Sequence, residues 1–566
     1  METTAQTFRE PPAVEETLVR DDAAAVGVTS LDLIGRLTRI GAALSAEKDS
    51  GRLMELILDS AREFTGADGG TLYTRTDDDR LAFEIMFNES LNIHLGGTSG
   101  KPVELPPLNL YHADGSANRD MVAAWTAVSG DTVSIADAYD TQDFDFSGTR
   151  TFDEKTGYRS KSFLTVPMRN HTDEVIGVLQ LINARERTGD GFGELRPFSL
   201  GDQQLVESLT SQAAIALTNK RLIEEQKQLF ESFIELIAAA IDDKSPYTGG
   251  HCRRVPVLTM ALADAAAATS DGPLADFAMS EEDRYELRIA GWLHDCGKVT
   301  TPEYVVDKAT KLETIHDRIN VVDARFDVLR QAARADHAER CIAAIDAGDA
   351  ASVREQSEAE YRAVMTRLDD EQAFLRTANV GGEFMSEEHQ ARVREIGSQT
   401  VPGADPQPLL TEDEIENLNI ERGTLTQAER GIINYHIVAT IKMLESLPYP
   451  KHLARVPEFA GGHHERMDGK GYPRGLTRDQ MSIQARVMGI ADIFEALTAA
   501  DRPYKKAMKL SQALTILGRM KEDNHVDPDL FDVFIRSKVY LDYANTHLDP
   551  AQVDEVDESK IPGYVA

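Results

Sequence analysis

The stretch HHERMDGKGYPRG, His463 to Gly475, places two adjacent histidines and a glutamate directly before a loop rich in glycine. On a regular helix, neighbouring residues point about 100° apart, so two adjacent side chains rarely reach one ion. At a helix end or in a loop the backbone can turn both rings inward, and glycine permits such a turn. Glycines stand on both sides of the pair, at Gly461, Gly462, Gly469 and Gly471. The sequence therefore predicts that His463 and His464 both face one site.

Seven histidines and aspartates stand in segments that otherwise resemble buried helices or their ends. They are His251 in YTGGHCRRV, His294 and Asp295 in LRIAGWLHDCGK, His436 in RGIINYHIVATIKML, the pair His463 and His464, and Asp492 in MGIADIFEALT. A single buried histidine is usually a satisfied core residue, and a single buried aspartate is usually a cap or an ion-pair partner. A carboxylate is costly to bury without a partner that offsets its charge. One common cause, a cluster of metal ions, explains all seven, and this ligand mixture suits iron, manganese or zinc but not calcium.

Length and composition indicate a multidomain protein without a membrane span. The chain has 566 residues, of which 42% are hydrophobic, and this length predicts about two to four domains. No stretch approaches the roughly 18 to 20 consecutive apolar residues that a membrane-spanning helix needs. The opening METTAQTFREPPAVEE lacks the apolar core of a secretory signal. Residues 1–28 are interpreted as a disordered polar tail.

Cysteine usage and charge limit the compartment and the partners. The chain has three widely spaced cysteines, Cys252, Cys296 and Cys341, which predict free thiols in a reducing compartment. A cytoplasmic location is therefore expected. The formal net charge of −35 disfavours DNA and RNA, because binding to these polymers depends on Lys and Arg contacts to phosphates. A small anionic ligand remains compatible with a local basic pocket.

Residues from about 30 to 200 alternate helical patterns with short strands such as GGTLYTRT, LAFEIMF and EVIGVLQLIN. This alternation predicts a compact α+β module. With these elements, the segment DAYDTQDFDFSGTRTFDEKTGYRSKSFLTVPMRNHTDEVIGVLQLINA resembles a GAF domain, in particular the regulatory GAF domains of cyclic-nucleotide phosphodiesterases. The resemblance implies a GAF sensor domain at residues 29–202.

The ligand motif of those GAF domains is matched only in part. They often carry an Asn-Lys pair, then a Phe, then an Asp-Glu pair. Here Asn183, Phe198 and Asp202 match, whereas Ala184 and Gln203 replace the Lys and the Glu. The resemblance thus implies Asn183, Phe198 and Asp202 as candidates for a cyclic-nucleotide site. A GAF domain that binds another small molecule, or that serves only for dimerisation, stays an alternative.

Residues 203–243 are predicted to form one long signalling helix. Apolar residues recur at every seventh position, at Leu209, Ala216, Ile223, Phe230 and Ile237, which indicates a coiled-coil seam. The intervening positions are partly polar, at Gln212, Asn219 and Gln226, and such residues fix register at a cost in stability. A parallel homodimer is expected, and a helix that packs on its own domain is the alternative.

Four segments, HDCGK, GGHHERMDGKGYPRGL, IQARVMGIADIFEALTAADRPYKKA and DPDLFDVF, resemble the HD-GYP family of cyclic-di-GMP phosphodiesterases. The resemblance implies an all-α HD-GYP domain at residues 244–545, followed by a C-terminal tail at 546–566. Residues 314–423, which include VREQSEAEYRAVMTRLDDEQAFLR, have no place in the compact family pattern. They are predicted to form a charged, solvent-facing helical insertion. The expected fold is therefore multidomain, with an α+β GAF domain, a long coiled-coil helix and an all-α HD-GYP domain.

The resemblance also implies a role for individual residues. One metal would be held by His251, His294, Asp295 and Asp492, and Asp295 would bridge to a second metal held by His436, His463 and His464. Iron is the first choice for both ions, with manganese or zinc as alternatives. Some family members bind a third metal through a carboxylate four residues before the first histidine, where this chain has Tyr247, so two ions are expected.

Other residues are implied around the metals. Asp295 and Lys298 would be catalytic, with Lys298 facing the scissile phosphate, and Arg502 and Lys505 would contact the ligand's phosphates. The loop of Gly471, Tyr472 and Pro473 would border the pocket and dock partners such as GGDEF-domain proteins. We interpret Glu465 as a partner that orients a histidine.

The implied activity is hydrolysis of cyclic-di-GMP to linear pGpG and/or GMP by a metal-activated water, under control of the GAF domain. Two alternatives stay open. The first is a catalytically silent HD-GYP sensor or adaptor that binds cyclic-di-GMP or diguanylate cyclases. The second is a hydrolase of another cyclic nucleotide. The presence of all seven candidate ligands and Lys298 favours the enzyme.

Overall fold

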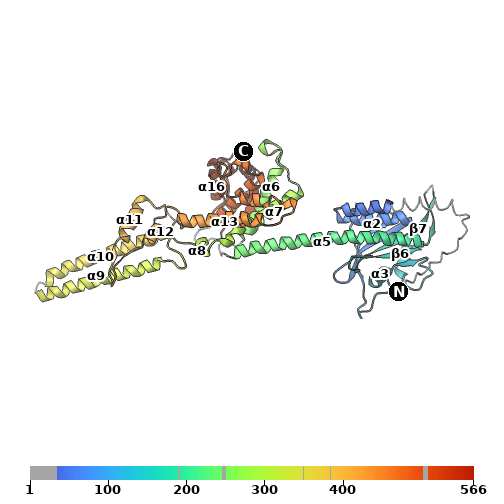
Figure 1. Cartoon of the computed structure of the whole chain (residues 1–566), viewed down its shortest axis with the longest axis horizontal. Coiled ribbons are helices and arrows are strands. Elements are labelled where there is room, and N and C mark those ends of the chain that lie inside the picture. The colour runs from blue at the N-terminus through green and yellow to red at the C-terminus, as the bar shows by residue number, and fades with distance from the viewer. Residues whose placement is uncertain are drawn as a thin grey trace, which may run out of the picture. The chain divides into compact units, whose positions relative to one another are not determined.

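The computed structural model describes residues 35–188, 191–244, 250–347, 350–382, 384–500 and 508–565. The chain divides into two compact units, residues 1–228 and residues 229–566 (Figure 1). Each unit has hydrophobic cores of its own. The predicted tail at residues 1–28 lies outside the described residues.

The N-terminal unit is built on an antiparallel sheet with the strand order β3-β2-β1-β7-β6-β5, to which β4 adds on β2 and β8 on β7. The strands are β1 (Ala67–Arg75), β2 (Arg80–Asn88), β3 (Ile93–Gly96), β4 (Leu108–Asn109), β5 (Val133–Ile135), β6 (Phe163–Arg169), β7 (Val175–Thr188) and β8 (Gly191–Arg196). The helices are α2 (Ser50–Thr65), α3 (Val122–Ser129), α4 (Ser147–Thr156) and the long α5 (Leu200–Lys244). The predicted α+β class of this unit is confirmed.

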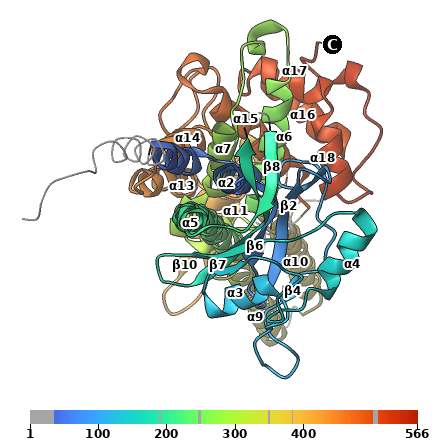
Figure 2. The ribbon, with the colours of Figure 1, turned by 90° about the vertical axis from the view of Figure 1, so that its right-hand side faces the viewer.

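Helices cover both faces of this sheet (Figure 2). Successive side chains of a strand point to opposite faces, so Leu72 of β1 joins a core with α2 and α5, whereas Tyr73 joins a core with α3. In β7, Leu179 and Val178 divide in the same way. Asp49 begins α2 by accepting a hydrogen bond from the Arg52 N–H, the usual role of an N-cap aspartate.

The predicted heptad of the long helix is wrong in part, because three of its five residues pack inside the units. Leu209 is buried in the core of the N-terminal unit, and Ala216 packs against that core. Phe230 packs against the core of the C-terminal unit. Only Ile223 and Ile237 are exposed, by 65% and 46%. Apolar pairs such as Leu222 and Ile223 produce two stripes of the same period, and the sequence alone does not separate them.

The exposed stripe of α5 lies at neighbouring positions with the same seven-residue period. It consists of Ile215, Leu222, Leu229 and Leu236, each at least half exposed. Phe233 is exposed beside them. An apolar seven-residue repeat of this kind is typical of a coiled-coil seam.

The C-terminal unit is helical. Its main helices are α6 (His251–Ala267), α7 (Glu281–Leu293), α8 (Glu303–Val306), α13 (Gln427–Glu445), α14 (Val456–Gly461), α15 (Ile483–Thr498), α16 (Leu510–Glu522), α17 (Pro528–Arg536) and α18 (Val539–His547), with the 3₁₀ turn η2 (Cys296–Thr300). Polar residues cap the N-termini of several of these helices. Ser280 and Asp283 form a capping box at α7, and Thr426 and Glu429 form another at α13. The predicted all-α class is confirmed for this unit.

The predicted insertion at residues 314–423 forms helices with a small core of their own. They are α9 (Ile319–Ala347), α10 (Ala350–Asn379), α11 (Glu387–Gly397) and α12 (Glu412–Leu418), with a short pair of strands, β9 (Thr400–Val401) and β10 (Gln407–Pro408). α9 and α10 lie side by side as a hairpin (Figure 1). Ion pairs such as Arg330 with Asp369 and Arg376 with Asp323 join its two helices. The charge run thus includes contacts across the hairpin as well as solvated side chains.

A buried ion pair joins Lys308, which precedes this insertion, to the helix that carries His436, and the same lysine contacts the insertion at Asn417. The Lys308 Nζ lies 2.8 Å from both carboxylate oxygens of Glu429 and 2.7 Å from the Asn417 Oδ1. Lys308 is buried. Removing one partner of a buried pair leaves an uncompensated charge. We expect Lys308→Met to lower the free energy of unfolding by about 3–5 kcal/mol.

Thermal unfolding of the full chain tests this expectation. The double variant Lys308→Met/Glu429→Gln removes both charges and should be less destabilised than the single variant. Lys560→Met removes an exposed ion pair with Asp557 and should change the transition much less. A Lys308→Met protein as stable as the Lys560→Met protein would contradict the expectation.

The predicted C-terminal tail is instead part of the helical unit. Gln552 is buried, and its side-chain amide donates to the carbonyls of Thr498 and Met508. Ile561 joins the main core. The apolar residues of this charged segment are few and irregularly spaced, so no sequence pattern predicts that it packs on the core. Within the described residues, no helix combines the length and the apolarity needed to cross a bilayer.

Candidate metal centre

Six elements of the C-terminal unit bring the seven predicted ligands together. His251 is the first residue of α6, His294 follows α7, Asp295 precedes η2, His436 lies within α13, Asp492 lies within α15, and His463 and His464 follow the end of α14. Because α14 ends at Gly461, the adjacent histidines are not on a regular helix. Gly462 allows a close approach there, since a Cβ at this position would lie 2.8 Å from the Ala485 Cβ.

Four of the predicted ligands form the first group, His251, His294, Asp295 and Asp492, with all four side chains buried. The His251 Nε2 lies 3.2 Å from the Asp295 Oδ2 and 3.2 Å from the Asp492 Oδ1. It lies 3.3 Å from the His294 Nε2. Ligands at about 2.1 Å from one ion are about 3.0–3.4 Å apart at right or tetrahedral angles. The spacing therefore suits one metal ion.

The second group consists of His436, His463 and His464. The Nε2 atoms of His436 and His464 lie 3.3 Å apart. The His436 Nε2 lies 3.2 Å from the Asp295 Oδ1, whereas the Oδ2 of the same carboxylate faces the first group. The Asp295 carboxylate therefore lies between the two groups, where a bridging ligand would stand.

Hydrogen bonds orient three of the histidine rings. The Nδ1 atoms of His294, His436 and His463 lie 2.6–2.7 Å from backbone carbonyls three residues earlier. A carbonyl only accepts, so each Nδ1 carries the proton and each Nε2 keeps its lone pair. Lone pairs that face each other repel unless a cation lies between them. The buried His463 Nε2 and Asp295 Oδ1 also lack a hydrogen-bond partner in the described structure. The donor set thus fits divalent metal ions.

The protonation states of the second group agree with this fit. Burial, together with the neighbouring His464 ring, holds the pKa of His463 well below its usual value. Burial lowers the pKa of His464 to about 4. Both rings are then neutral at pH 7, as metal ligands must be. Binding is expected to weaken as the pH falls toward these values.

The acidic ligands of the first group are ionised. Burial alone would raise the pKa of Asp295, but the ammonium of Lys298 and the neighbouring histidine rings outweigh burial, and the pKa lies well below its usual value. Burial would also raise the pKa of Asp492, but His251 outweighs burial, and this pKa too lies below its usual value. Both carboxylates therefore offer negative charge to a cation.

Lys298 contacts the shared carboxylate. Its Nζ lies 2.5 Å from the Asp295 Oδ2. Burial would lower the pKa of Lys298, but Asp295 and Asp492 outweigh burial, so this pKa lies above its usual value. The side chain stays cationic across the neutral range and is 28% exposed, so it reaches the solvent side of the centre.

A hollow of about 480 Å³ opens beside the two groups. Its lining includes His463, His464, Asp492, Arg466, Lys470, Gly471, Tyr472, Ile493, Leu497, Met520 and His525. The Tyr472 ring stacks on His464, with centroids 4.9 Å apart. The hollow has the mixed apolar and basic lining that suits an anionic ligand with aromatic parts.

The loop before the hollow depends on close backbone packing. A Cβ at Gly471 would lie 2.4 Å from the Arg466 N, so only glycine fits without movement. Glu465 is buried, and its carboxylate accepts hydrogen bonds from the N–H groups of Arg474 and Leu476. Our interpretation that Glu465 orients a histidine is therefore wrong, because its two oxygens hold the loop.

The remaining predicted residues divide between the loop beside the hollow and segments outside the described residues. Arg502 and Lys505, the predicted phosphate contacts, lie outside the described residues, as does Tyr247. Gly471 and Tyr472 line the hollow. Pro473 follows them in the same loop.

Glu495 is a residue of the centre that the sequence analysis missed. Its Oε2 lies 2.5 Å from the His251 Nδ1, and its Oε1 accepts from Arg254. Burial would lower the pKa of His251, but the charges of Glu495 and the other carboxylates raise it well above its usual value in the absence of a metal. A carboxylate behind a ligand histidine fixes the ring and increases its basicity. Its position three residues after Asp492 in an apolar helix was the available signal.

We expect Glu495→Gln to weaken metal binding by about 10- to 100-fold, the usual effect of losing a carboxylate behind a ligand histidine. Titration of the metal-free full chain with Co²⁺, followed by visible absorption, measures the affinity. Glu286→Gln is the matched control, because Glu286 is equally buried and pairs with Arg455 away from the centre. Equal Co²⁺ affinities in the two variants would exclude this role for Glu495.

The three predicted GAF ligand residues are satisfied inside the N-terminal unit. The Asn183 Oδ1 accepts from the N–H groups of Lys161 and Ser162. Phe198 lies in the core beside α2 and α5. The Asp202 carboxylate pairs with Arg196 and accepts from the Ser199 N–H. These contacts give each of the three side chains a structural role within the unit.

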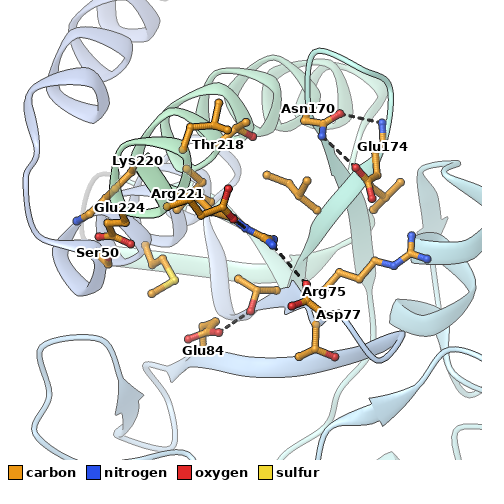
Figure 3. Close-up of a pocket in the computed structure, with 18 of the residues that line it drawn as sticks. Ser50, Arg75, Asp77, Glu84, Asn170, Glu174, Thr218, Lys220, Arg221 and Glu224 are labelled. Carbon is orange, nitrogen blue, oxygen red and sulfur yellow. Dashed lines mark hydrogen bonds and ion pairs between the residues drawn. The ribbon is translucent and has the colours of Figure 1, made fainter. Parts of the chain in front are cut away.

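The N-terminal unit has a hollow of about 690 Å³ between α5 and two turns of the sheet (Figure 3). Polar side chains that line this hollow contact one another. Arg221 forms ion pairs with Asp77 and Glu225, and Asn170 donates a hydrogen bond to Glu174. Its lining does not include Asn183, Phe198 or Asp202.

Family models match three parts of the chain. A model described as GAF domain matches residues 49–217, and two models described as HD domain match residues 248–359 and 412–530. The chain is a protein with an N-terminal GAF domain and a C-terminal HD domain, as the resemblance implied. An HD domain implies binding of divalent metal, and the two groups of side chains are capable of it.

Curated relatives match within shorter stretches. Two 3'3'-cGAMP-specific phosphodiesterases of Vibrio cholerae, numbered 3 and 1, are 43% and 44% identical over 19% and 14% of this chain. The cyclic di-GMP phosphodiesterase PA4108 of Pseudomonas aeruginosa is 35% identical over 26% of this chain. The chain spans 23%, 19% and 31% of the lengths of these three relatives, respectively.

Proposed function

We propose that the HD domain is a metal-dependent phosphodiesterase that opens a cyclic dinucleotide. The carrying observation is the convergence of seven ligand side chains in two groups that share Asp295, beside a hollow with basic residues. The names of the curated relatives support phosphodiester hydrolysis as the reaction class.

The proposed centre holds two divalent ions. His251, His294, Asp295 and Asp492 would hold one, and His436, His463 and His464 with Asp295 would hold the other. Iron is the first choice, with manganese or zinc as alternatives, because imidazole and carboxylate ligands suit all three. Bound ions of this kind supply a water of lowered pKa and take up charge on phosphoryl oxygens.

The chain's own residues give the reaction its geometry. The Nδ1 hydrogen bonds and Glu495 hold the histidine rings with their Nε2 atoms toward the centre. The cationic Lys298 is placed to stabilise negative charge that develops on the substrate phosphate. The Tyr472 ring and the apolar wall of the hollow provide a surface for part of a nucleobase.

We propose cyclic-di-GMP as the substrate, with linear pGpG and/or GMP as products. The second candidate is 3'3'-cGAMP, because the two relatives of highest identity given above carry that specificity in their names. A further alternative is a catalytically silent sensor or adaptor that binds the dinucleotide or GGDEF-domain proteins at the Gly471–Pro473 loop. The metal ligands are all present, which supports the enzyme.

One experiment separates these candidates. The full chain is purified anaerobically, its metals are counted, and cyclic-di-GMP and 3'3'-cGAMP are followed separately by chromatography. Faster turnover of cyclic-di-GMP supports the first proposal, and faster turnover of 3'3'-cGAMP supports the second. Binding without turnover of either compound, in protein with two metals per chain, would favour the sensor.

We also propose that the GAF domain regulates the HD domain through α5 and that the protein is a parallel homodimer. The exposed repeat of Ile215, Leu222, Leu229 and Leu236 supports the dimer. The GAF ligand is proposed as a small molecule or cyclic nucleotide of unassigned identity. The three free cysteines support a reducing, cytoplasmic location. A monomeric mass in solution would contradict the dimer.

A further inference from the structure

The last turn of α5 contacts the start of the helix that carries His251. Asp242 is buried, and its carboxylate accepts hydrogen bonds from the N–H of Gly250 at 3.0 Å and from the N–H of Cys252 at 3.2 Å. The first N–H groups of a helix have no partner within the helix, and a carboxylate there is favourable. His251 lies between the two bonded residues. Asp242 therefore fixes the backbone from which the His251 side chain leaves.

Two residues later, the same helix contacts the turn that carries Lys298. The Lys244 Nζ donates to the carbonyls of Lys298 at 3.1 Å, of Val299 at 2.5 Å and of Thr301 at 2.6 Å. The carbonyls at the end of a helical turn attract a cation. One ammonium thus satisfies three backbone acceptors of the η2 turn and its exit.

This turn is held rigidly on its other side by α13. The Gly297 N–H donates to the Thr440 Oγ1 at 2.9 Å, and a Cβ at Gly297 would lie 2.0 Å from the His436 carbonyl oxygen. The Lys298 N–H donates to the Asp295 carbonyl at 2.9 Å. The backbone between Asp295 and Thr301 therefore lies between α13 and the ammonium of Lys244, and a shift of that ammonium would move the turn.

Each of the two contacts pairs a charged side chain with backbone groups of opposite partial charge. A carboxylate meets N–H groups at α6, and an ammonium meets carbonyls at η2. They come from residues two apart at the end of one helix, and they reach the segments that carry ligands of the first group. α5 also contributes Ile234, Ala238 and Ile241 to the core of this unit. This packing anchors the last turns of α5 to the C-terminal unit.

We infer that Asp242 and Lys244 are positioning residues of the metal centre, by which the end of α5 sets the geometry of His251, Asp295 and Lys298. The inference rests on the proposed function for its consequence in turnover, but not for its consequence in metal binding. The contacts described above join both residues to backbone groups beside the ligands. A displacement of α5 would reach the centre through these two contacts.

Variants of the full chain test the inference. Lys244→Met removes the three donors, Lys244→Arg keeps a cation with donors, and Asp242→Asn keeps the shape without the charge. Lys451→Met, at an exposed lysine of the same unit, is the matched control. The metal-free proteins are titrated with Co²⁺ and followed by visible absorption, and thermal unfolding is recorded for each.

We expect Lys244→Met and Asp242→Asn to bind Co²⁺ about tenfold more weakly, the lower end of the effects of residues that support metal ligands. Lys244→Arg should recover at least half of the loss on a logarithmic scale, and Lys451→Met should match the unchanged protein. With metal bound and cyclic-di-GMP as substrate, kcat should fall about tenfold with KM unchanged, because both residues act through backbone groups that carry the ligands and Lys298.

Two results would overturn the inference. One is unchanged Co²⁺ affinity in both Lys244→Met and Asp242→Asn. The other is a loss that follows the fall in unfolding temperature and is not recovered by Lys244→Arg, since that pattern is structural only. If the unchanged protein turned over no cyclic dinucleotide, the proposed function would fail while the Co²⁺ titration still decided this inference.

Discussion

Replacing Asp295 with alanine is expected to lower kcat/KM by at least about 10³-fold, equivalent to about 4 kcal/mol of transition-state stabilisation, and to reduce the metal content. The reason is its place between the two groups. Its Oδ2 lies 3.2 Å from the His251 Nε2, and its Oδ1 lies 3.2 Å from the His436 Nε2. A single substitution therefore removes a ligand from both proposed ions, which no other residue of the set would do.

Elemental analysis and turnover measured on the same preparation test this prediction. Asp283→Ala is the control, because Asp283 completes the capping box of α7 by accepting from the Ser280 N–H, and loss of a helix-capping contact costs about 1 kcal/mol. The control should keep its metal and its turnover. An Asp295→Ala protein with two metals per chain and full activity would exclude the bridging role.

The metal groups could be predicted from the sequence because a charged side chain in a buried segment is unfavourable without a partner. His294 and Asp295 follow the apolar end of α7, at Trp292 and Leu293, and Asp492 lies among apolar residues of α15, so each needs a partner. The family resemblance then assigned the seven side chains to two sets, and the structure gathers the same two sets. Motif spacing is informative here because five of the seven ligands stand at or beside helix ends, whereas His436 and Asp492 lie within helices.

The supporting residues could not be predicted in the same way. Glu465 stands beside His464 in the sequence, yet its carboxylate bonds the backbone of Arg474 and Leu476. Glu495 is 244 positions from His251, and only the fold brings the two together. Adjacency in sequence does not tell where a side chain points, and a partner distant in sequence leaves no local pattern.

The register of α5 failed for a related reason. Leu222 and Ile223, Leu229 and Phe230, and Leu236 and Ile237 are apolar pairs, so two seven-residue stripes run along one helix. Burial within the units uses part of one stripe, and the other is exposed. A period identifies a helix with two apolar faces but does not tell which face is covered.

Replacing Lys298 with methionine is expected to lower kcat by about 10²–10³-fold, the usual cost of losing a group that stabilises transition-state charge. The metal content should stay near that of the unchanged protein, since Lys298 offers no metal-binding atom while its ammonium is protonated. The pKa of Lys298 lies above its usual value, because Asp295 and Asp492 outweigh its burial. Its charge is thus present throughout the neutral range, and activity should not fall between pH 7 and pH 9 through loss of this proton.

Comparison of two variants separates two roles of Lys298, the stabilisation of charge on the substrate and the positioning of the Asp295 carboxylate. Lys298→Arg keeps a cation and should retain more activity than Lys298→Met, while Lys451→Met, at an exposed lysine, should retain all of it. If Lys298→Met kept its metals but lost kcat with KM little changed, the ammonium would act on the transition state. If it lost its metals, the contact of 2.5 Å with the Asp295 Oδ2 would be the role of Lys298, and the prediction that this lysine faces the phosphate would be wrong. Unchanged kcat with full metal content would exclude both roles and leave the two metal groups as the whole of the proposed catalytic machinery.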